Sequence, residues 1–439
     1  MVNSLHKSRT FCVVNLGCKL NFAEASTLAR QLGGMGFVQA GEGEAADVYV
    51  VHTCAVTAQA EKKCRQAIRK LAGQGGNAAI CVTGCYALLK GDELRQMPGV
   101  TLVADKREAV QKIGEYFARS GYACCPPPTS TATDDDDDAD FFTAYSSGDR
   151  TRSFLKVQDG CDYRCSYCTV PLARGASRSA AIEKVAEQAR KIAEQGVNEV
   201  VLTGVNIGDF GKSTGENFLQ LAQRLEAVEG ISRYRISSIE PNLLTAALVD
   251  FVAGSSKFLP HFHIPLQAGS NRVLGLMRRR YTRELFAEKL RYIRAKMPLA
   301  FIGVDVIAGF PTETEEEFES ACSFLEELQP SYLHIFPYSK RPNTPAAAMP
   351  QTPDAQISSR AKRLGALCAA LQADFYRQNV GKTGSVLFES ACRNGRMFGF
   401  SENYVKVALP YSADLANKIV PVRMTGVGED GNMRCEVVK

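Results

Sequence analysis

The segment Cys161–Cys168, which reads CDYRCSYC, places three cysteines within eight residues, at Cys161, Cys165 and Cys168. It comes shortly after the apolar run Phe154–Val157. A loop this tight can turn three sulfur atoms towards one centre, and thiolate sulfur is the preferred ligand of iron in iron–sulfur clusters. A mononuclear zinc site would need a fourth ligand, and no further cysteine or histidine lies nearby in the sequence. We therefore expect a four-iron cluster with one open iron; the alternatives are a structural zinc loop or a chance group of cysteines.

The spacing C-x-x-x-C-x-x-C, with the aromatic Tyr167 directly before the third cysteine, resembles the motif of the radical S-adenosylmethionine (SAM) superfamily. The resemblance implies that the amino and carboxylate groups of SAM chelate the open iron. It also implies that one electron from the cluster cleaves SAM to a 5′-deoxyadenosyl radical. The motif alone does not identify the reaction in which the radical is used; that depends on the rest of the chain.

The bulk composition is that of a globular protein with several domains. A chain of 439 residues with 45% hydrophobic and 23% charged residues predicts about two to four domains. No apolar run approaches the roughly 20 residues needed to span a bilayer, and Met1–Thr10 lacks the apolar core of a signal peptide. We expect a cytoplasmic protein without a membrane partner. Fifteen cysteines then indicate metal ligation or buried thiols rather than disulfides, and a net charge of +5 permits a nucleic-acid partner.

Three short runs in the first ninety residues each lead into a cysteine. They are Phe11–Gly17 before Cys18, Ala46–Thr53 before Cys54, and Ala78–Gly84 before Cys85. Runs of this kind form buried parallel strands, and helical patterns follow at Ala23–Leu32 and Ala58–Leu71. Since the carboxyl ends of parallel strands share one edge of a sheet, the three strand-end cysteines predict a second three-thiolate cluster. The alternative is buried free cysteines, the interpretation we prefer for Cys12, Cys64 and Cys81.

The segments around these cysteines resemble the N-terminal domain of the methylthiotransferases. They are Gly17–Asn21 (GCKLN), Thr53–Thr57 (TCAVT) and Thr83–Ala87 (TGCYA). In that family the domain carries an auxiliary 4Fe–4S cluster that takes part in delivering sulfur. The resemblance implies Cys18, Cys54 and Cys85 as its ligands, in addition to Cys161, Cys165 and Cys168 for the SAM cluster.

A connector separates the first domain from the middle of the chain. Cys124 and Cys125 are followed by three prolines, and Asp134–Asp138 are five consecutive aspartates. Prolines and self-repelling charges cannot bury a core, so we expect a flexible linker in which neither cysteine is a ligand. A cation site at the aspartates is the less favoured alternative.

From Phe154 onward, strand and helix patterns alternate and predict six β-α units. The strands are expected at 154–157, 199–202, 233–239, 262–266, 301–306 and 333–336, and the helices at 182–195, 218–228, 243–252, 283–296 and 315–328. Six units make an incomplete TIM-like barrel, a partial (β/α)6 fold, whose chemistry belongs at the carboxyl ends of the strands. Polar and glycine-rich strand ends there are candidates for holding SAM. The candidate SAM contacts are Tyr167, Thr203, Gly204, Asn206, Ser238, Glu240 and Gln267. The alternative is that each strand end is an ordinary turn.

Two further features of the middle region have more than one interpretation. His261 and His263 alternate along one predicted strand and face the same side, but no carboxylate or cysteine pairs with them by spacing. We favour structural hydrogen bonding over metal binding for both. The run Arg278–Arg283 carries four arginines and predicts a solvated face or, near the barrel mouth, a grip on an RNA backbone.

The last sixty residues predict a small β-barrel. After a helical stretch at 357–378, short strands are expected at 384–388, 397–400, 405–408, 419–424 and 434–438, and Asn394-Gly395 is a strong hairpin signal. Tyr404 and Phe398 are candidates for stacking on bases or for core packing. In the methylthiotransferases this position is filled by a TRAM domain, an OB-like barrel that binds tRNA.

Further motifs extend the resemblance to the methylthiotransferases over nearly all of residues 10–375. They include Leu202–Asn206 (LTGVN), His263–Ser270 (HIPLQAGS), Phe336–Ala346 (FPYSKRPNTPA) and Ala173–Ser179 (ARGASRS). The last two are most similar to the threonylcarbamoyladenosine tRNA methylthiotransferases. The predicted α/β chain then divides into an open parallel sheet domain (9–122), a linker (123–148), the radical SAM barrel (149–378) and the TRAM-like barrel (379–439).

The resemblance implies an enzyme that adds a methylthio group to C2 of N6-threonylcarbamoyladenosine beside the tRNA anticodon. Its cofactors would be two 4Fe–4S clusters and SAM, with no catalytic residue assigned beyond the cluster ligands. Its partners would be tRNA and a flavodoxin- or ferredoxin-like reductant, and we expect a monomer. The alternatives are the same chemistry on isopentenyladenosine tRNA or on a ribosomal protein aspartate, or a non-catalytic RNA-binding iron–sulfur protein.

Overall fold

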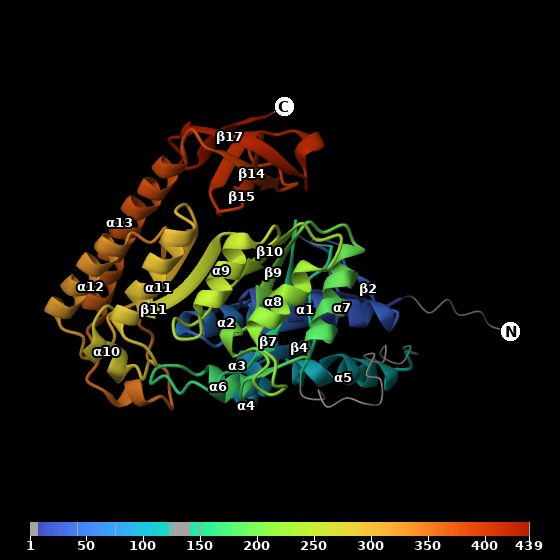
Figure 1. The fold of residues 1–439 in the computed structure, drawn as a ribbon. Coiled ribbons are helices and arrows are strands. Elements are labelled where there is room, and N and C mark those ends of the chain that lie inside the picture. Colours follow the sequence, from blue (N-terminus) through green and yellow to red (C-terminus); the bar gives the residue numbers. More distant parts are fainter. Residues whose placement is uncertain are drawn as a thin grey trace.

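The first third of the chain forms an open parallel sheet, blue to cyan in Figure 1. A computed structural model describes residues 8–41, 43–74, 76–122, 125, 141–148 and 151–438 of the chain. The strand order is β2-β1-β3-β4-β5. The strands are β1 (Thr10–Asn15), β2 (Val38–Gln39), β3 (Val48–Thr53), β4 (Ala79–Gly84) and β5 (Leu102–Val103). Every residue of β3 and β4 is buried, which explains their continuous apolar sequences.

Helices cover both faces of this sheet. They are α1 (Lys19–Gly34), α2 (Ala58–Ala72), α3 (Cys85–Leu89), α4 (Gly91–Arg95) and α5 (Lys106–Ala118). Leu28 of α1 and Ile113 of α5 pack against one face, and Ile68 of α2 packs against the other. Because β1, β3 and β4 are neighbouring parallel strands, their carboxyl ends lie at one edge of the sheet.

The middle of the chain forms the predicted six-stranded partial barrel. Its strands are β6 (Arg152–Lys156), β9 (Glu199–Thr203), β10 (Arg233–Ile236), β11 (His261–Gln267), β12 (Phe301–Ala308) and β13 (Tyr332–Pro337). They form two parallel three-stranded sheets, ordered β10-β9-β6 and β11-β12-β13. Isolated bridges between Tyr234 and Phe258 and between Ser238 and His263 join the two sheets. A short antiparallel pair, β7 (Gln158–Asp159) with β8 (Arg178–Ser179), flanks the three-cysteine loop.

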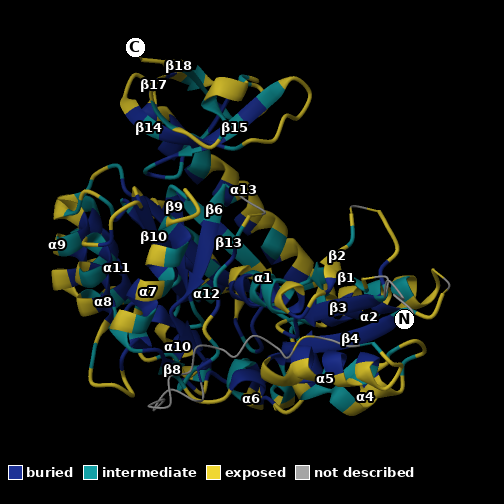
Figure 2. Cartoon of the chain, turned by 90° about the vertical axis from the view of Figure 1, so that its right-hand side faces the viewer, coloured by how far each residue is buried: buried dark blue, intermediate teal, exposed yellow. Residues whose placement is uncertain are grey.

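The barrel helices lie outside the strands and enclose the largest hydrophobic core. They are α6 (Val170–Arg174), α7 (Ile182–Ala193), α8 (Phe218–Glu226), α9 (Ala246–Gly254), α10 (Asn271–Leu276), α11 (Arg283–Lys296), α12 (Glu315–Leu328) and α13 (Asp354–Asn379). Figure 2 shows buried strands between helices whose outer faces are exposed. The six predicted strands and the five predicted helices of this region are confirmed, with ends that differ by at most three residues. Within the described residues, no helix combines the length and the apolar character needed to cross a membrane.

Helix α13 leads into a closed C-terminal barrel with strand order β14-β15-β16-β18-β17, red in Figure 1. Its strands are β14 (Thr383–Phe388), β15 (Arg396–Ser401), β16 (Lys406–Pro410), β17 (Ile419–Val427) and β18 (Met433–Val437). Asn394 and Gly395 both have positive φ, 52° and 71°, as the predicted hairpin turn requires. The ring of Tyr404 packs on His261 and Phe301, with ring centroids 4.9 and 5.3 Å away. The small barrel therefore covers the starts of β11 and β12, at the end of the larger barrel opposite the cysteine loop.

Only part of the predicted linker belongs to the described structure. Cys124 and the aspartates 134–138 lie outside the described residues. Residues 141–148 are described and pack onto the domains: Phe141 and Ala144 are buried, and Tyr145 pairs with Leu155. The last eight residues of the predicted connector thus pack between α1 and β6.

Candidate cluster and cofactor site

The three cysteines of the Cys161–Cys168 loop lie above the carboxyl end of β6. Burial and, to a lesser extent, the neighbouring thiols of Cys168 and Cys165 raise the pKa of Cys161 to about 12. Three N–H groups donate to the sulfurs: the backbone N–H of Tyr163 to Cys161 (3.4 Å), that of Val170 to Cys168 (3.4 Å), and an Arg279 N–H to Cys165 (3.1 Å). The structure therefore brings the three thiols together and places N–H donors against their sulfurs, as is typical around metal ligands.

Arg279 connects the cysteine loop with two of the candidate SAM contacts. Its side chain is 4% exposed and forms an ion pair with Glu240. One of its N–H groups also lies 3.4 Å from the hydroxyl of Tyr167. Burial raises the pKa of Glu240, and the guanidinium of Arg279 opposes this rise. Arg279 is thus not part of a solvated face, although its neighbour Arg278 is exposed.

Arg280, the third arginine of the run, also contacts the cysteine loop. Its guanidinium lies 4.1 Å from the ring centroid of Tyr163, and it donates to the backbone carbonyl of Asp162 (3.2 Å). The hydroxyl of Tyr163 in turn accepts a hydrogen bond from Asn242 (2.7 Å). Sequence reasoning missed these contacts because a run of like charges gives no sign of which member turns inward.

Three further candidate SAM contacts gather around Gln158 at the end of β9. The side-chain oxygen of Gln158 accepts from the backbone N–H groups of Val205 (2.9 Å) and Asn206 (2.8 Å). A Cβ at Gly204 would lie 2.9 Å from that oxygen, so glycine is required for this close approach. Thr203 is the last residue of β9, and Asn206 donates to Asp209 (3.1 Å). The buried side-chain oxygen of Asn206 has no hydrogen-bond partner in the described part of the chain and is available to a ligand.

The other two candidates lie on the neighbouring strands. Ser238 follows β10 and pairs with His263 through a β-bridge. Gln267 ends β11 with a positive φ of 66°, at the point where the pairing of β11 with β12 shifts. Among the described residues, no hydrogen bond joins Gln267 to the other six candidates. The structure therefore groups Tyr167 with Glu240, and Thr203 with Gly204 and Asn206.

The second set of cysteines gathers at the edge of the N-terminal sheet. Cys18 follows β1 and caps α1, Cys54 follows β3, and Cys85 begins α3 directly after β4. Burial and, to a lesser extent, the thiols of Cys18 and Cys85 raise the pKa of Cys54 to about 12. Cys64, which we expected to be a buried structural cysteine, is fully buried and donates to the backbone carbonyl of Cys54 (3.6 Å).

A buried network of charges joins this edge to the cysteine loop of the barrel. Arg174, at the end of α6, donates to the sulfur of Cys85 (3.2 Å) and to the carboxylates of Glu24 (3.1 Å) and Asp159 (2.8 Å). Lys106 and Lys156 pair with the same two carboxylates, at distances of 2.7–3.1 Å. Glu24 and Asp159 are fully buried, and the three cations hold the pKa of both carboxyl groups below the usual range. No sequence signal identified this network, because its members come from four distant segments.

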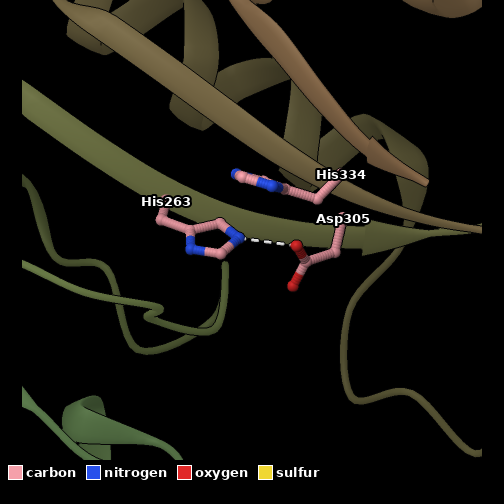
Figure 3. A group of neighbouring side chains, drawn as sticks. All are labelled: His263, Asp305 and His334. Carbon is pink, nitrogen blue, oxygen red and sulfur yellow. Dashed lines mark hydrogen bonds and ion pairs between the residues drawn. The ribbon is translucent and has the colours of Figure 1, made fainter. Parts of the chain in front are cut away.

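Three polar side chains point into the barrel from adjacent strands (Figure 3). His263 of β11 forms a 2.6 Å hydrogen bond with Asp305 of β12, and its ring lies 4.6 Å from the ring of His334 on β13. His261 stacks on Phe301 and bonds the carbonyl of Ile236, which is the structural role we expected. Burial lowers the pKa of His334 to about 4, so this imidazole is neutral at pH 7. Two imidazoles and one carboxylate can bind a divalent metal or hydrogen-bond to a ligand in the barrel.

Comparison with known proteins identifies both large domains. Residues 155–325 match the model of the radical SAM superfamily, and residues 10–105 match that of an uncharacterized protein family, UPF0004. The fold is similar to that of the radical SAM methyltransferase TsrM from Kitasatospora setae, with a TM-score of 0.53, 15% identity, and coverage of 78% of this chain and 77% of that one. The superfamily match implies that the protein uses SAM and a 4Fe–4S cluster.

Relatives with named activities match almost the whole chain. Threonylcarbamoyladenosine tRNA methylthiotransferase MtaB of Bacillus subtilis is 38% identical over 420 residues, which are 94% of this chain and 93% of that protein. The tRNA-2-methylthio-N(6)-dimethylallyladenosine synthase of Pelotomaculum thermopropionicum is 31% identical, over 95% of each chain. With this coverage and the radical SAM barrel, the chain belongs to the family of radical SAM tRNA methylthiotransferases.

Proposed function

We propose that this enzyme adds a methylthio group to C2 of N6-threonylcarbamoyladenosine beside the anticodon of tRNA, using two 4Fe–4S clusters. The observation that carries the proposal is the pair of three-thiol groups at the ends of two parallel sheets, joined through Arg174. One cluster would suffice to cleave SAM. A second group of three thiols, at the edge where an α/β sheet binds ligands, supports a separate sulfur-carrying site.

We assign Cys161, Cys165 and Cys168 to the cluster that binds SAM. The N–H groups of Tyr163, Val170 and Arg279 that donate to these sulfurs fit a thiolate-ligated cluster, whose sulfurs accept such bonds in the protein. When bound, the cluster and SAM supply the radical that abstracts hydrogen from the substrate carbon. The protein's own contribution is to hold the loop in place.

We assign the groups at the strand ends to SAM itself. Asn206 offers an unpartnered buried oxygen, and Ser238 and Gln267 follow neighbouring strands. Glu240 and Tyr167 are held against the cysteine loop by Arg279, and Thr203 and Gly204 complete the end of β9. A zwitterionic methionyl group and a ribose need donors and acceptors of these kinds.

We assign Cys18, Cys54 and Cys85 to the auxiliary cluster. Their fit rests on the chemistry of the donor set: three thiols at one edge and an arginine N–H that donates to Cys85. Binding metal would release the protons that burial otherwise holds on Cys54 and Cys85. Cys12 and Cys81, within β1 and β4, remain structural in this proposal.

The identity of the modified base rests on similarity. A relative named for threonylcarbamoyladenosine is 38% identical, compared with 31% for one named for dimethylallyladenosine. We further propose that the C-terminal barrel is a TRAM-like tRNA-binding domain, with domain limits at 9–122, 149–378 and 379–439. A flavodoxin- or ferredoxin-like reductant, a monomeric state and action on tRNA in the cytoplasm complete the proposal.

Mass spectrometry of tRNA nucleosides tests the proposed function directly. The gene would be expressed in a host whose own methylthiotransferases have been deleted, and the digested tRNA would be analysed. We expect 2-methylthio-N6-threonylcarbamoyladenosine and no 2-methylthio derivative of isopentenyladenosine. If only the 2-methylthio derivative of isopentenyladenosine is found, the enzyme acts on isopentenyladenosine tRNA instead. A ribosomal protein with a methylthio mass shift would make a protein aspartate the substrate, and no 5′-deoxyadenosine from SAM and reduced protein would exclude catalysis.

A further inference from the structure

A cavity of about 390 Å³ opens between the three parts of the chain, beside Cys18. Its walls come from the start of α1, from β6, β9 and β10 of the larger barrel, and from the C-terminal barrel. The charged side chains that line it are Lys19, Arg152 and Arg235, and no carboxylate lines it. Its aromatic walls are Phe22, Phe154 and Tyr404. A cavity with three cations and three aromatic rings fits a flat, anionic ligand.

Lys19 is the least compensated of these cations. Within the described ranges it forms no ion pair, and its residue is exposed towards the cavity. It is also the first residue of α1, where the helix dipole favours a negative charge, and that first turn contains no acidic residue. A lysine at this position is unfavourable for the isolated helix. Burial and the charges of Arg235 and Arg152 lower the pKa of Lys19, while Cys18 and Asp305 oppose this shift.

The two arginines hold the opposite wall of the cavity in place. Arg235 is 2% exposed, bonds Glu199 at 3.1 Å and lies over the ring of Tyr404 at 4.6 Å. Arg152 pairs with the same Glu199 at 2.8 Å, yet one buried terminal nitrogen of its guanidinium has no hydrogen-bond partner in the described structure. Arg152 also pairs with Glu389 at 3.5 Å. Glu199 is fully buried, and neither carboxylate lines the cavity, whose charged lining is positive.

We propose that Lys19, supported by Arg152 and Arg235, binds the carboxylate of the threonylcarbamoyl group of the substrate adenosine. This inference rests on the proposed function, and it deepens it by naming the residues that select the base. The aromatic walls accept the purine, and Cys18 places the base next to the proposed auxiliary cluster. A dimethylallyl group would bring an apolar surface against three cations and leave them without an anion, which disfavours that base.

An RNA phosphate is the other anion that could reach this cavity. Changing the substrate carboxylate and changing Lys19, separately and together, distinguishes the carboxylate from a phosphate. Two anticodon stem-loops would be compared, one with N6-threonylcarbamoyladenosine and one in which its carboxylate is a methyl ester. Their Kd values for the reconstituted full-length protein would be measured by fluorescence anisotropy. For the wild-type protein we expect binding to weaken by about 10- to 100-fold on esterification, as for the loss of one charge-assisted hydrogen bond.

The variant Lys19→Gln identifies the partner of that carboxylate. We expect this variant to bind the acid stem-loop more weakly than the wild type does, by a factor similar to that of esterification. It should bind the ester stem-loop with the same Kd as the wild type. Lys19→Arg, which keeps the charge, should retain most of the discrimination. Lys191→Gln, on the exposed outer face of α7, is the matched control and should change neither Kd.

Two results would overturn the inference. If Lys19→Gln weakens both stem-loops by the same factor, the lysine contacts a phosphate; if the wild-type protein binds both equally, the carboxylate is not recognised. Iron content and 5′-deoxyadenosine release without RNA would show that each variant is folded and loaded. The proposed function fails separately, if the wild-type protein does not methylthiolate the acid stem-loop.

Discussion

At the scale of single residues, the site depends on positions that only one amino acid can fill. Gly160 immediately precedes Cys161 and has a positive φ of 69°. A Cβ at this position would overlap the backbone carbonyl oxygen of Ala176. The same turn orients Cys161, whose backbone N–H donates to Gly175 at 3.1 Å. A glycine is therefore required where the chain leaves β7 and enters the cysteine loop.

The variant Gly160→Ala should displace the loop without unfolding the barrel. We expect iron content after anaerobic reconstitution to fall by about half, because only the cluster of the barrel is affected. Gly196→Ala is the matched control, since Gly196 has a similar φ of 71° but no neighbour within 4 Å of an added Cβ. Equal iron content in the two variants would contradict the role given to Gly160.

Arg174 allows a second prediction at this scale. Arg174→Met removes a fully enclosed cation from two buried carboxylates and a donor from Cys85. Breaking a buried ion pair in this way costs about 3–5 kcal/mol, so the free energy of unfolding should fall by that amount in urea denaturation. Arg190→Met removes a surface ion pair with Glu183 and should cost less than about 1 kcal/mol. Comparable losses in the two variants would mean that the network does not hold the domains together.

At the scale of elements, α13 is fastened to the loop that enters α12 by a buried ion pair between Arg360 and Glu313. Arg360 of α13 is 1% exposed and contacts Glu313 at 2.9 Å and Glu315 at 3.1 Å. Burial raises the pKa of Glu313 to about 7, although Arg360 opposes the rise. Since this folded-state pKa lies above the unfolded value, the carboxyl group stabilises the fold most at low pH, and this contribution is lost as the pH rises through about 7.

In the variant Arg360→Met, the loss of stability between low and high pH should be larger than in the wild type. Without its cation, Glu313 resists ionisation more strongly, so the variant should be close to wild type in stability near pH 5 and clearly less stable at pH 8. The measurement is the urea midpoint at both pH values. Arg360→Met/Glu313→Gln should recover most of the loss at pH 8. A loss that is the same at both pH values would show that Glu313 is already ionised in the fold.

The elements themselves were largely predictable from the sequence, and their side-chain partners were not. Continuous apolar runs identified β3, β4 and the six barrel strands, and the Asn394-Gly395 turn was identified by its residue types. These signals are local. The pairing of His263 with Asp305 depends on which strands are adjacent, and Asp305 is 42 residues away in the chain. Arg279 could not be distinguished from its neighbours in a run of arginines, although it alone is buried against Cys165.

At the scale of the whole molecule, the arrangement places two groups of thiols on either side of one domain interface. Arg174 follows the cysteine loop of the barrel and contacts Cys85 of the N-terminal sheet, while Cys18 lines the cavity closed by Tyr404 of the C-terminal barrel. All three parts of the chain therefore meet around one region. In the proposed function, the sheet edge with its three cysteines therefore faces the cysteine loop of the barrel through Cys85 and the cavity through Cys18.

The triple variant Cys18→Ala/Cys54→Ala/Cys85→Ala tests the central claim of two clusters with divided roles. After anaerobic reconstitution, we expect iron to fall from about eight to about four atoms per chain, since each cluster holds four. The variant should still release 5′-deoxyadenosine from SAM but form no methylthio product on tRNA. Full iron content, or a methylthiolated base, in this variant would contradict the account.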